Sequence, residues 1–508
     1  MSKNSILIRQ VGLIVILTAL AKIGAFAKDV LLSIQFGGSF QTDAYFIANA
    51  IPGFIFGGVF ATIGMVFLPI FKRAAIISEY EASTTYRTAA IGYTLLSAFL
   101  GAVTFIEAST IVSTIAPGLP MTTHDLAVQM TRIMAFSFVF SGWVGLQNAV
   151  LQSHKLLIWP QVVQLLNHMF VIGGLAVAWM INGAITFLVY AAVIGWMVIA
   201  PLVSLKAAKF WPKVRGQWFR KSTALTMAAL SFPVFLSLTL DQSSILIGTY
   251  LGSFFPEGAI SHLNYAQRLI LLLSSVFSMV IAYVLFPYLT DTIVANQITQ
   301  TRRFMALALI AVLLLSAPLL VMSVVMNEAL ISFVYQRGNF SAMDAMTTAR
   351  VLVFFAPIIV LAGVREVLNR LFLAWQETKA LLLFSVLSLV VNLIASVYFS
   401  HTIGLEGIAL GATCGVLAYV AAQVFMILAR NKHLLHPDLL LWITLIAVAT
   451  TISAITSQWL DAQDLIDNAR IDFVFNALAV VLVFGAAIFV PVFLFPRLRE
   501  IYKTEQST

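Results

Sequence analysis

Charged side chains stand inside or beside long apolar stretches near the start of this chain, at Lys22, Lys28, Asp29 and Asp43. A charge within a bilayer costs a few kcal/mol or more, so it usually faces the interior of a helix bundle or a wet cavity. Cations lining such a cavity would suit an anionic substrate. The alternative is that Lys22 and Lys28 reach the headgroup layer along their apolar stems, or that Lys28 pairs locally with Asp29.

These charges must be positioned by membrane-spanning helices. The 508 residues are 61% hydrophobic and 10% charged, whereas charged residues make up about a quarter of soluble proteins. Apolar runs of about 20 residues, each long enough to span a bilayer, recur from end to end. They are too long and too uniformly apolar for barrel strands. The sequence predicts an all-α integral membrane protein, and its single cysteine, Cys414, excludes an internal disulfide.

The distribution of positive charge along the chain indicates membrane topology and not binding to nucleic acid. The net charge is +8, but roughly 20 of the 29 Lys and Arg residues fall in alternate loops or at the ends, the pattern of cytoplasmic loops. Both termini are therefore expected in the cytoplasm, with residues 206–221 cytoplasmic and 253–258 outside. The sequence has no Gly-x-x-x-x-Gly-Lys-Ser/Thr phosphate loop.

About fourteen helices are expected from the apolar runs and turn signals. The basic, Trp-containing segment Lys206–Lys221 is the longest cytoplasmic connection. We interpret it as a connector whose charge sets topology, with binding to anionic lipid headgroups as the alternative. The expected helices are 8–34, 44–71, 88–115, 125–152, 157–181, 184–207, 223–251, 259–289, 304–335, 343–374, 380–400, 405–429, 438–459 and 472–495.

The two sides of this connector resemble each other. Thr131-Arg132-Ile-Met-Ala-Phe136 echoes Ala349-Arg350-Val-Leu-Val-Phe354, and Gly145 and Gly363 follow each Arg at the same spacing. Six helices on each side predict two parallel repeats with a substrate site between them. We therefore divide the chain into an N-lobe, 1–210, a C-lobe, 211–432, and a third part, 433–508, with two extra helices and a cytoplasmic tail.

Other charges near helix ends have local explanations. Arg365 and Glu366 can form a structural pair, and Asp125 and Asp344 stand where they can cap helix starts. Arg268, like Lys22 and Lys28, has no obvious acidic neighbour one helical turn away.

Three motifs then identify a relative. The sequence Phe36-Gly-Gly-Ser-Phe-Gln-Thr-Asp43-Ala-Tyr-Phe-Ile-Ala-Asn-Ala-Ile-Pro52 resembles a signature of the MurJ/MviN lipid II flippase family. Phe255-Pro-Glu-Gly258 through Asn264-Tyr-Ala-Gln-Arg268 resembles a second, and Tyr335-Gln-Arg-Gly-Asn-Phe340 followed by Thr348-Ala-Arg350 resembles a third. The resemblance implies a V-shaped, two-lobed bundle that alternates between inward- and outward-open states. Such a protein is not an enzyme and moves an undecaprenyl-pyrophosphate-linked glycan across the bacterial inner membrane.

The resemblance also implies site residues. Its cavity positions match Lys22 and Lys28, where the family usually has Arg, together with Asp43 and Arg268; lysine offers pyrophosphate a point charge in place of a bidentate fork. The family's basic residues after Pro52 are missing here. A sodium site found in part of the family would place carboxylates where this chain has Gly248 and Ser396, leaving Asn392 as a family-like ligand and Asp241 about two turns away. We expect no cofactor. Whether transport is coupled to an ion, and whether that ion is a proton or sodium, stays open.

Alternatives stay open as well. An O-antigen or exopolysaccharide flippase would share the fold, whereas a multidrug exporter fits a cationic cavity poorly. The apolar run before Ala25-Phe-Ala27 also fits a signal peptide, but cleavage there would remove Lys22, and we expect the helix to be retained. The expected partners are the lipid-linked glycan and membrane lipids, with the protein a monomer.

Overall fold

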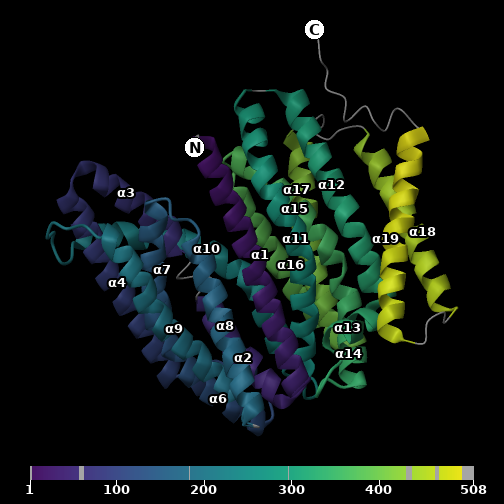
Figure 1. The fold of residues 1–508 in the computed structure, drawn as a ribbon, viewed down its shortest axis with the longest axis horizontal. Helices are drawn as coiled ribbons and strands as arrows, with labels where there is room; N and C mark the ends of the chain where they lie inside the picture. The colour runs from purple at the N-terminus through teal and green to yellow at the C-terminus, as the bar shows by residue number, and fades with distance from the viewer. Residues whose placement is uncertain are drawn as a thin grey trace. The chain divides into compact units, whose positions relative to one another are not determined.

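The computed structural model describes residues 3–55, 62–181, 183–295, 297–430, 438–463 and 468–494, and all the regular structure within these ranges is helical (Figure 1). The α-helical class predicted from hydropathy is thereby confirmed. The helices are α1 Lys3–Phe36, α2 Phe40–Ile55, the π-helix η2 Ile63–Phe67, α3 Leu68–Ile77, α4 Glu79–Ile106, α5 Ala108–Ile115, α6 Met121–Ala135, α7 Ser137–Ser153, α8 Trp159–Met180, α9 Thr186–Ala207, the short η3 Ala208–Phe210, α10 Lys221–Gly252, α11 Ala259–Val294, α12 Ile298–Val325, α13 Asn327–Tyr335, α14 Ala342–Phe355, α15 Pro357–Ala374, α16 Thr378–Ile403, α17 Leu405–Arg430, α18 Leu439–Asp461 and α19 Ala469–Leu494.

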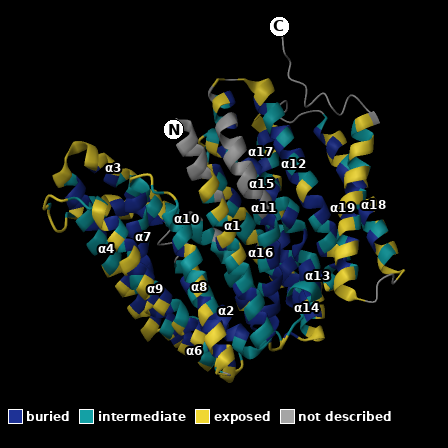
Figure 2. Ribbon diagram, viewed as in Figure 1, coloured by how far each residue is buried: buried dark blue, intermediate teal, exposed yellow. Residues whose placement is uncertain are grey.

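Many of these helices are long and apolar enough to span a membrane. In the described residues, ten helices are long and apolar enough to cross a bilayer, and the bent pair α6 and α7 raises the number to eleven. Large apolar side chains on their outer faces are exposed, as on α9, α18 and α19 (Figure 2). Lipid chains, and not water, are the solvent that such faces require. The chain is therefore a multi-pass membrane protein, and the count of fourteen crossings stays a prediction.

Several helices begin or break at positions other than those expected from hydropathy. Helix α4 begins at Glu79, not at residue 88, because the Ser78 side chain caps it by accepting a hydrogen bond from the backbone N–H of Glu81. The expected segment 343–374 breaks between α14 and α15 at Pro357, which has no N–H to continue the helical ladder. Hydropathy averaged along the sequence does not detect a polar first turn or a break at proline.

The described helices group into two compact units. The first contains Met1–Ser261 and the tripeptide Gly338–Phe340, and the second contains His262–Arg337 and Ser341–Thr508. Helix α10 belongs to the first unit, where it packs against α2, α4, α5 and η2. This boundary falls later than the division at 210 and 211, which was drawn from the internal repeat and stays a prediction.

Each unit has its own packing. In the first unit α1 packs on α8, α2 on α6, and α9 on both α7 and α8. The core of the second unit joins α12, α15, α17 and α18 around large buried side chains, among them Trp442, Phe372 and Phe384.

The closest helix pair in the second unit is α16 with α17. Gly407, Gly411 and Gly415 stand four residues apart on α17, and a Cβ atom on each would overlap or crowd α16. Small residues at this spacing let two helices approach closely in a membrane, where packing replaces the hydrophobic driving force.

Replacing Gly411 with alanine should therefore destabilise the protein. The new Cβ would overlap Ser396, and overpacking costs about 1–3 kcal/mol. Thermal unfolding of the purified protein should show a lower Tm for Gly411→Ala. The matched control is Gly173→Ala on α8, which has no atom within 4 Å of the new Cβ and should leave the Tm unchanged or slightly raised. Equal Tm values for the two variants would contradict close packing at Gly411.

Candidate functional site

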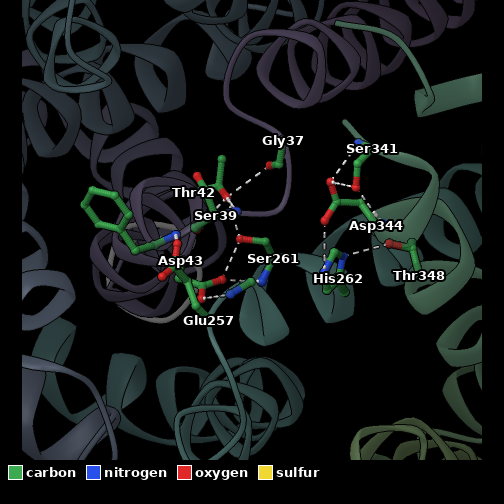
Figure 3. Close-up of polar contacts among 12 residues, drawn as sticks. Gly37, Ser39, Thr42, Asp43, Glu257, Ser261, His262, Ser341, Asp344 and Thr348 are labelled. Carbon is green, nitrogen blue, oxygen red and sulfur yellow. Dashed lines mark hydrogen bonds and ion pairs between the residues drawn. The ribbon is translucent and has the colours of Figure 1, made fainter. Parts of the chain in front are cut away.

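Asp43 is buried at the start of α2, where its carboxylate is surrounded by hydrogen-bond donors (Figure 3). Its Oδ2 accepts from the backbone N–H of Gly258 at 2.7 Å, and its Oδ1 accepts from the backbone N–H and the hydroxyl of Ser261 at 2.7 and 2.6 Å. Charge-assisted bonds of this kind are among the strongest in proteins. Asp43 therefore joins the start of α2 to the turn that precedes α11.

Further polar contacts reinforce the same junction. Ser261 Oγ lies 2.8 Å from the Thr42 hydroxyl oxygen, Thr42 donates to the Gly37 carbonyl at 3.1 Å, and Glu257 accepts from the backbone N–H of Phe40 at 2.8 Å. These polar groups, together with Asp43, come from two of the sequence motifs, 36–52 and 255–268. The predicted substrate residue Asp43 thus has a structural role in this unit, and its partner Ser261 was not predicted from the sequence.

The third motif joins the same unit through Gly338–Phe340. Asn339 donates its backbone N–H to the Ile34 carbonyl at 2.8 Å and its side-chain amide to the Gln35 carbonyl at 2.6 Å, both at the end of α1. Gly37 and Gly338 have φ values of 62° and 60°, and a Cβ on either would overlap the opposite backbone. Only glycine combines that backbone conformation with so close an approach.

The two predicted lysines of α1 differ in environment. Lys28 is buried, with 6% of its surface exposed, and its Nζ lies 3.1 Å from Asp29 Oδ1. Lys22 is half-buried, and no carboxylate of the described residues forms an ion pair with it. The local pair that the sequence allowed for Lys28 is confirmed, whereas Lys22 presents a charge without an acidic partner among the described residues.

The remaining predicted site residues lie on α10, α11 and α16. Arg268 is half-buried on α11, in the second unit. Asn392 is buried on α16, where its Oδ1 accepts from the Ser396 hydroxyl at 2.9 Å beside the glycines of α17. Asp241 lies on α10, but its side chain is outside the described residues.

A polar cluster in the second unit was not expected from the sequence. His262 Nδ1 lies 2.9 Å from the Thr348 hydroxyl, and its Nε2 lies 3.5 Å from Asp344 Oδ1 (Figure 3). Asp344 also forms a capping box with Ser341 at the start of α14, which confirms its predicted capping role. Asp125 does not cap, because α6 begins at Met121 and Asp125 lies beyond its first turn.

One predicted ion pair is wrong. Glu366 pairs with Arg370, one helical turn away, and not with its neighbour Arg365. Residues four apart share a helix face whereas adjacent residues do not. The Arg365 guanidinium lies over the Tyr419 ring, 4.9 Å from its centre.

The site residues therefore fall into two groups. Asp43 and the His262 cluster join separate helices through hydrogen bonds, whereas Asn392 bonds to Ser396 within α16. Lys22 and Arg268 are half-buried cations that could meet an anionic group. Among the described side chains, no three His, Cys, Asp or Glu residues stand close enough together to share a metal ion.

Comparisons with known proteins agree with the sequence motifs. The family model described as lipid II flippase MurJ matches residues 32–478. A probable lipid II flippase MurJ of Buchnera aphidicola subsp. Baizongia pistaciae is 26% identical, the match covering 76% of each chain. The lipid II flippase MurJ of Burkholderia cenocepacia is 25% identical over 83% of each chain.

Solved structures share the fold. A lipid II flippase MurJ in an inward closed conformation superimposes with a TM-score of 0.81 at 21% identity, covering 95% of this chain and 99% of the other. An inward-facing multidrug resistance MATE family transporter of the MOP superfamily gives a TM-score of 0.67 at 13% identity, covering 82% of this chain and 95% of the other. At these identities the likeness shows the fold alone.

The junction at Asp43 can be tested by removing its charge. Asp43→Asn turns an amide N–H₂ toward donors, so at least one buried donor loses its partner, at a cost of about 1–3 kcal/mol. Thermal unfolding should show a lower Tm for Asp43→Asn, whereas Glu257→Gln, which keeps an acceptor for Phe40 at an exposed position, should leave it unchanged. An unchanged Tm for Asp43→Asn would show that the carboxylate does not hold the junction.

Proposed function

Since this chain belongs to the lipid II flippase MurJ family, we propose that it moves lipid II, an undecaprenyl-pyrophosphate-linked glycan, across the bacterial inner membrane by alternating access. The observation that carries the proposal is the family-model match over residues 32–478, which extends through both compact units. The protein is a transporter in this proposal and not an enzyme.

The chemistry of the substrate explains what the cations do. The pyrophosphate of lipid II is anionic and cannot cross the hydrocarbon layer without compensation of its charge. Lys22, half-buried and without an acidic partner among the described residues, can supply a positive charge on α1. Arg268 offers a guanidinium, whose fork geometry suits phosphate oxygens.

Lys28 contributes differently in this proposal. Its ion pair with Asp29 offsets the cost of burying both charges, so it meets the substrate only by exchanging a carboxylate partner for a phosphate. Asp43 serves the transporter by holding α2 to the turn before α11, not by contacting the pyrophosphate.

The finer architecture is also part of the proposal. Each of the fourteen expected segments overlaps at least one helix of the described residues, which supports fourteen crossings. Two parallel six-helix repeats would form the lobes 1–210 and 211–432 of a V-shaped bundle, followed by two further helices in 433–508. Both termini would be cytoplasmic, and the protein would act as a monomer.

The missing basic residues after Pro52 favour one alternative substrate. A polyprenyl-linked glycan of another class, such as an O-antigen or exopolysaccharide precursor, presents the same pyrophosphate with a different headgroup. Depleting the protein and identifying the lipid-linked precursor that accumulates on the cytoplasmic side separates the two. Accumulation of lipid II supports the proposal, and accumulation of another glycan overturns its substrate.

The proposed orientation predicts opposite labelling of two exposed positions. In a Cys414→Ala background, Phe254→Cys should react with an impermeant thiol reagent added outside the cell, and Ser222→Cys should react only after the membrane is opened. Both positions are exposed, so burial does not protect either. Reaction of Ser222→Cys from outside, or equal labelling of both, would contradict the orientation.

The roles of Lys28 can be separated by removing the ion pair in two steps. Lys28→Ala removes the cation that pairs with the buried Asp29, at a cost of about 3–5 kcal/mol, and should lower the amount of protein in the membrane. The double variant Lys28→Met/Asp29→Leu removes both charges and should restore that amount.

The rate of lipid II flipping by these variants then tests whether Lys28 and Arg268 contact the substrate. We expect the double variant and Arg268→Ala to reach near-normal levels in the membrane and to flip little lipid II, measured as the fraction that an impermeant lipid II-degrading enzyme attacks from outside. Lys28→Arg, which keeps the charge, is the control and should flip normally. Full activity of the double variant would show that Lys28 is purely structural.

Sodium should not drive transport. The expected sodium positions hold Gly248 and Ser396, and the Ser396 hydroxyl already donates to Asn392. Carboxylate oxygens, which offset the dehydration of a cation, are absent at these two positions. Replacing sodium by potassium in a vesicle assay at constant potential and pH should leave flipping unchanged, whereas collapsing the membrane potential or proton gradient should reduce it. Loss of activity that sodium restores would contradict this expectation.

A further inference from the structure

A cavity of about 500 Å³ lies in the first unit between α3, the start of α4, the end of α7 and the connector that follows α9. Its size is that of ordinary small-ligand sites. Three lysines, Lys72, Lys209 and Lys213, line it together with the apolar side chains of Phe71, Ile76 and Pro212. The cavity therefore combines a cationic part with an apolar part.

The connector that forms one wall is fixed to α4 by hydrogen bonds along its length. The Glu79 carboxylate accepts from the backbone N–H of Lys213 at 2.8 Å, and the Ser83 hydroxyl accepts from Gly216 at 3.1 Å. Arg220 closes the series with two bonds to Glu81, at 2.5 and 2.9 Å, which raise the pKa of its guanidinium above the ordinary value. The wall is thus built before any ligand binds.

Aromatic contacts fix the rest of the lining. The Trp211 indole donates to Gln147 at 2.9 Å, and the Phe210 ring stacks on His154 with 4.5 Å between centres. These contacts hold η3 and the following residues against α7, and Lys209 and Lys213 stand on either side of them.

In the described lining of this cavity, three lysines stand against one carboxylate, so positive charge exceeds negative charge by two. Among the described residues, none of the three lysines forms an ion pair, and the acid in the lining, Glu79, is engaged by the backbone of Lys213. Lysine ammonium groups attract phosphate as point charges. An anion is the natural counterpart of such a lining.

Exposed apolar side chains on α3 and on the connector point to a membrane surface as the source of that anion. Ile76 is 85% exposed, and Ile77 and Trp218 are both 74% exposed. Tryptophan beside basic residues is typical of the membrane–water interface, where anionic headgroups attract lysine and arginine.

We propose that this cavity binds the phosphodiester of an anionic phospholipid headgroup, with Lys72, Lys209 and Lys213 around the phosphate and the carbons of the lipid against Phe71 and Ile76. The site is separate from the transport pathway and stands whether or not the substrate is lipid II. It gives the basic connector a binding role in addition to its topological charge.

The test compares lipids on the full-length purified protein in a neutral detergent. Native mass spectrometry, titrated with phosphatidylglycerol or phosphatidylcholine, gives the apparent Kd of the first bound lipid. The triple variant Lys72→Gln/Lys209→Gln/Lys213→Gln should weaken phosphatidylglycerol binding by about tenfold or more and leave phosphatidylcholine unaffected.

A matched control removes the same charge elsewhere. Arg215→Gln/Lys221→Gln/Lys379→Gln replaces three exposed cations outside the cavity lining and should retain most of the phosphatidylglycerol affinity. Ala75→Phe fills the cavity without changing charge and should weaken binding as the triple variant does, which keeps the test decisive if the triple variant fails to fold.

Two results would overturn the proposal. Equal losses in the lining triple and the control triple would mean that diffuse surface charge, not the cavity, attracts the lipid. Displacement of the lipid by glycerol 1-phosphate at the same concentration as phosphatidylglycerol would mean that the site takes a soluble phosphate and not a lipid headgroup.

Discussion

The first unit depends on one buried charge being surrounded by donors. A carboxylate removed from water is tolerated only when hydrogen bonds or cations replace its hydration. Asp43 meets this requirement with two backbone N–H groups and a hydroxyl from residues 258–261. Because these donors lie far along the chain from α2, satisfying the carboxylate also fixes where the turn before α11 must lie. The bonds of Thr42 and Glu257 then add to an arrangement that the charge has already determined.

Hydropathy was sufficient to predict the helical class and most helix positions, because an apolar run long enough to span a bilayer can satisfy its backbone only as a helix. It could not place the start of α4, where polar residues follow the Ser78 cap. The motifs located Asp43 but not its hydrogen-bond partners, and Ser261 could not be found from sequence because hydroxyls that bond carboxylates share no local pattern. Glu366 pairs with Arg370 and not with Arg365, because residues four apart share a helix face whereas adjacent residues do not.

The cations of α1 show how similar residues acquire different properties in one helix. Adjacent side chains on a helix usually diverge, so the sequence alone left the Lys28–Asp29 pair as one possibility among several. Within the structure Lys28 has exchanged water for a carboxylate, whereas Lys22 has kept part of its hydration. A transporter that must release its substrate benefits from this difference, since a fully desolvated free cation would bind a pyrophosphate too tightly to let it go.

The contact of Asn339 with the end of α1 has a consequence for the order in which the protein is made. The last carbonyls of α1, those of Ile34 and Gln35, accept their hydrogen bonds from a residue that the ribosome adds about three hundred positions later. At about 5–20 residues per second, several seconds separate the synthesis of Ser261 from that of Asn339. During that interval residues 1–261 have been synthesised, but the donor for the last carbonyls of α1 has not. A chain interrupted before residue 338 would therefore lack most of its second unit and also the hydrogen bonds from Asn339 that complete the end of α1 in its first unit.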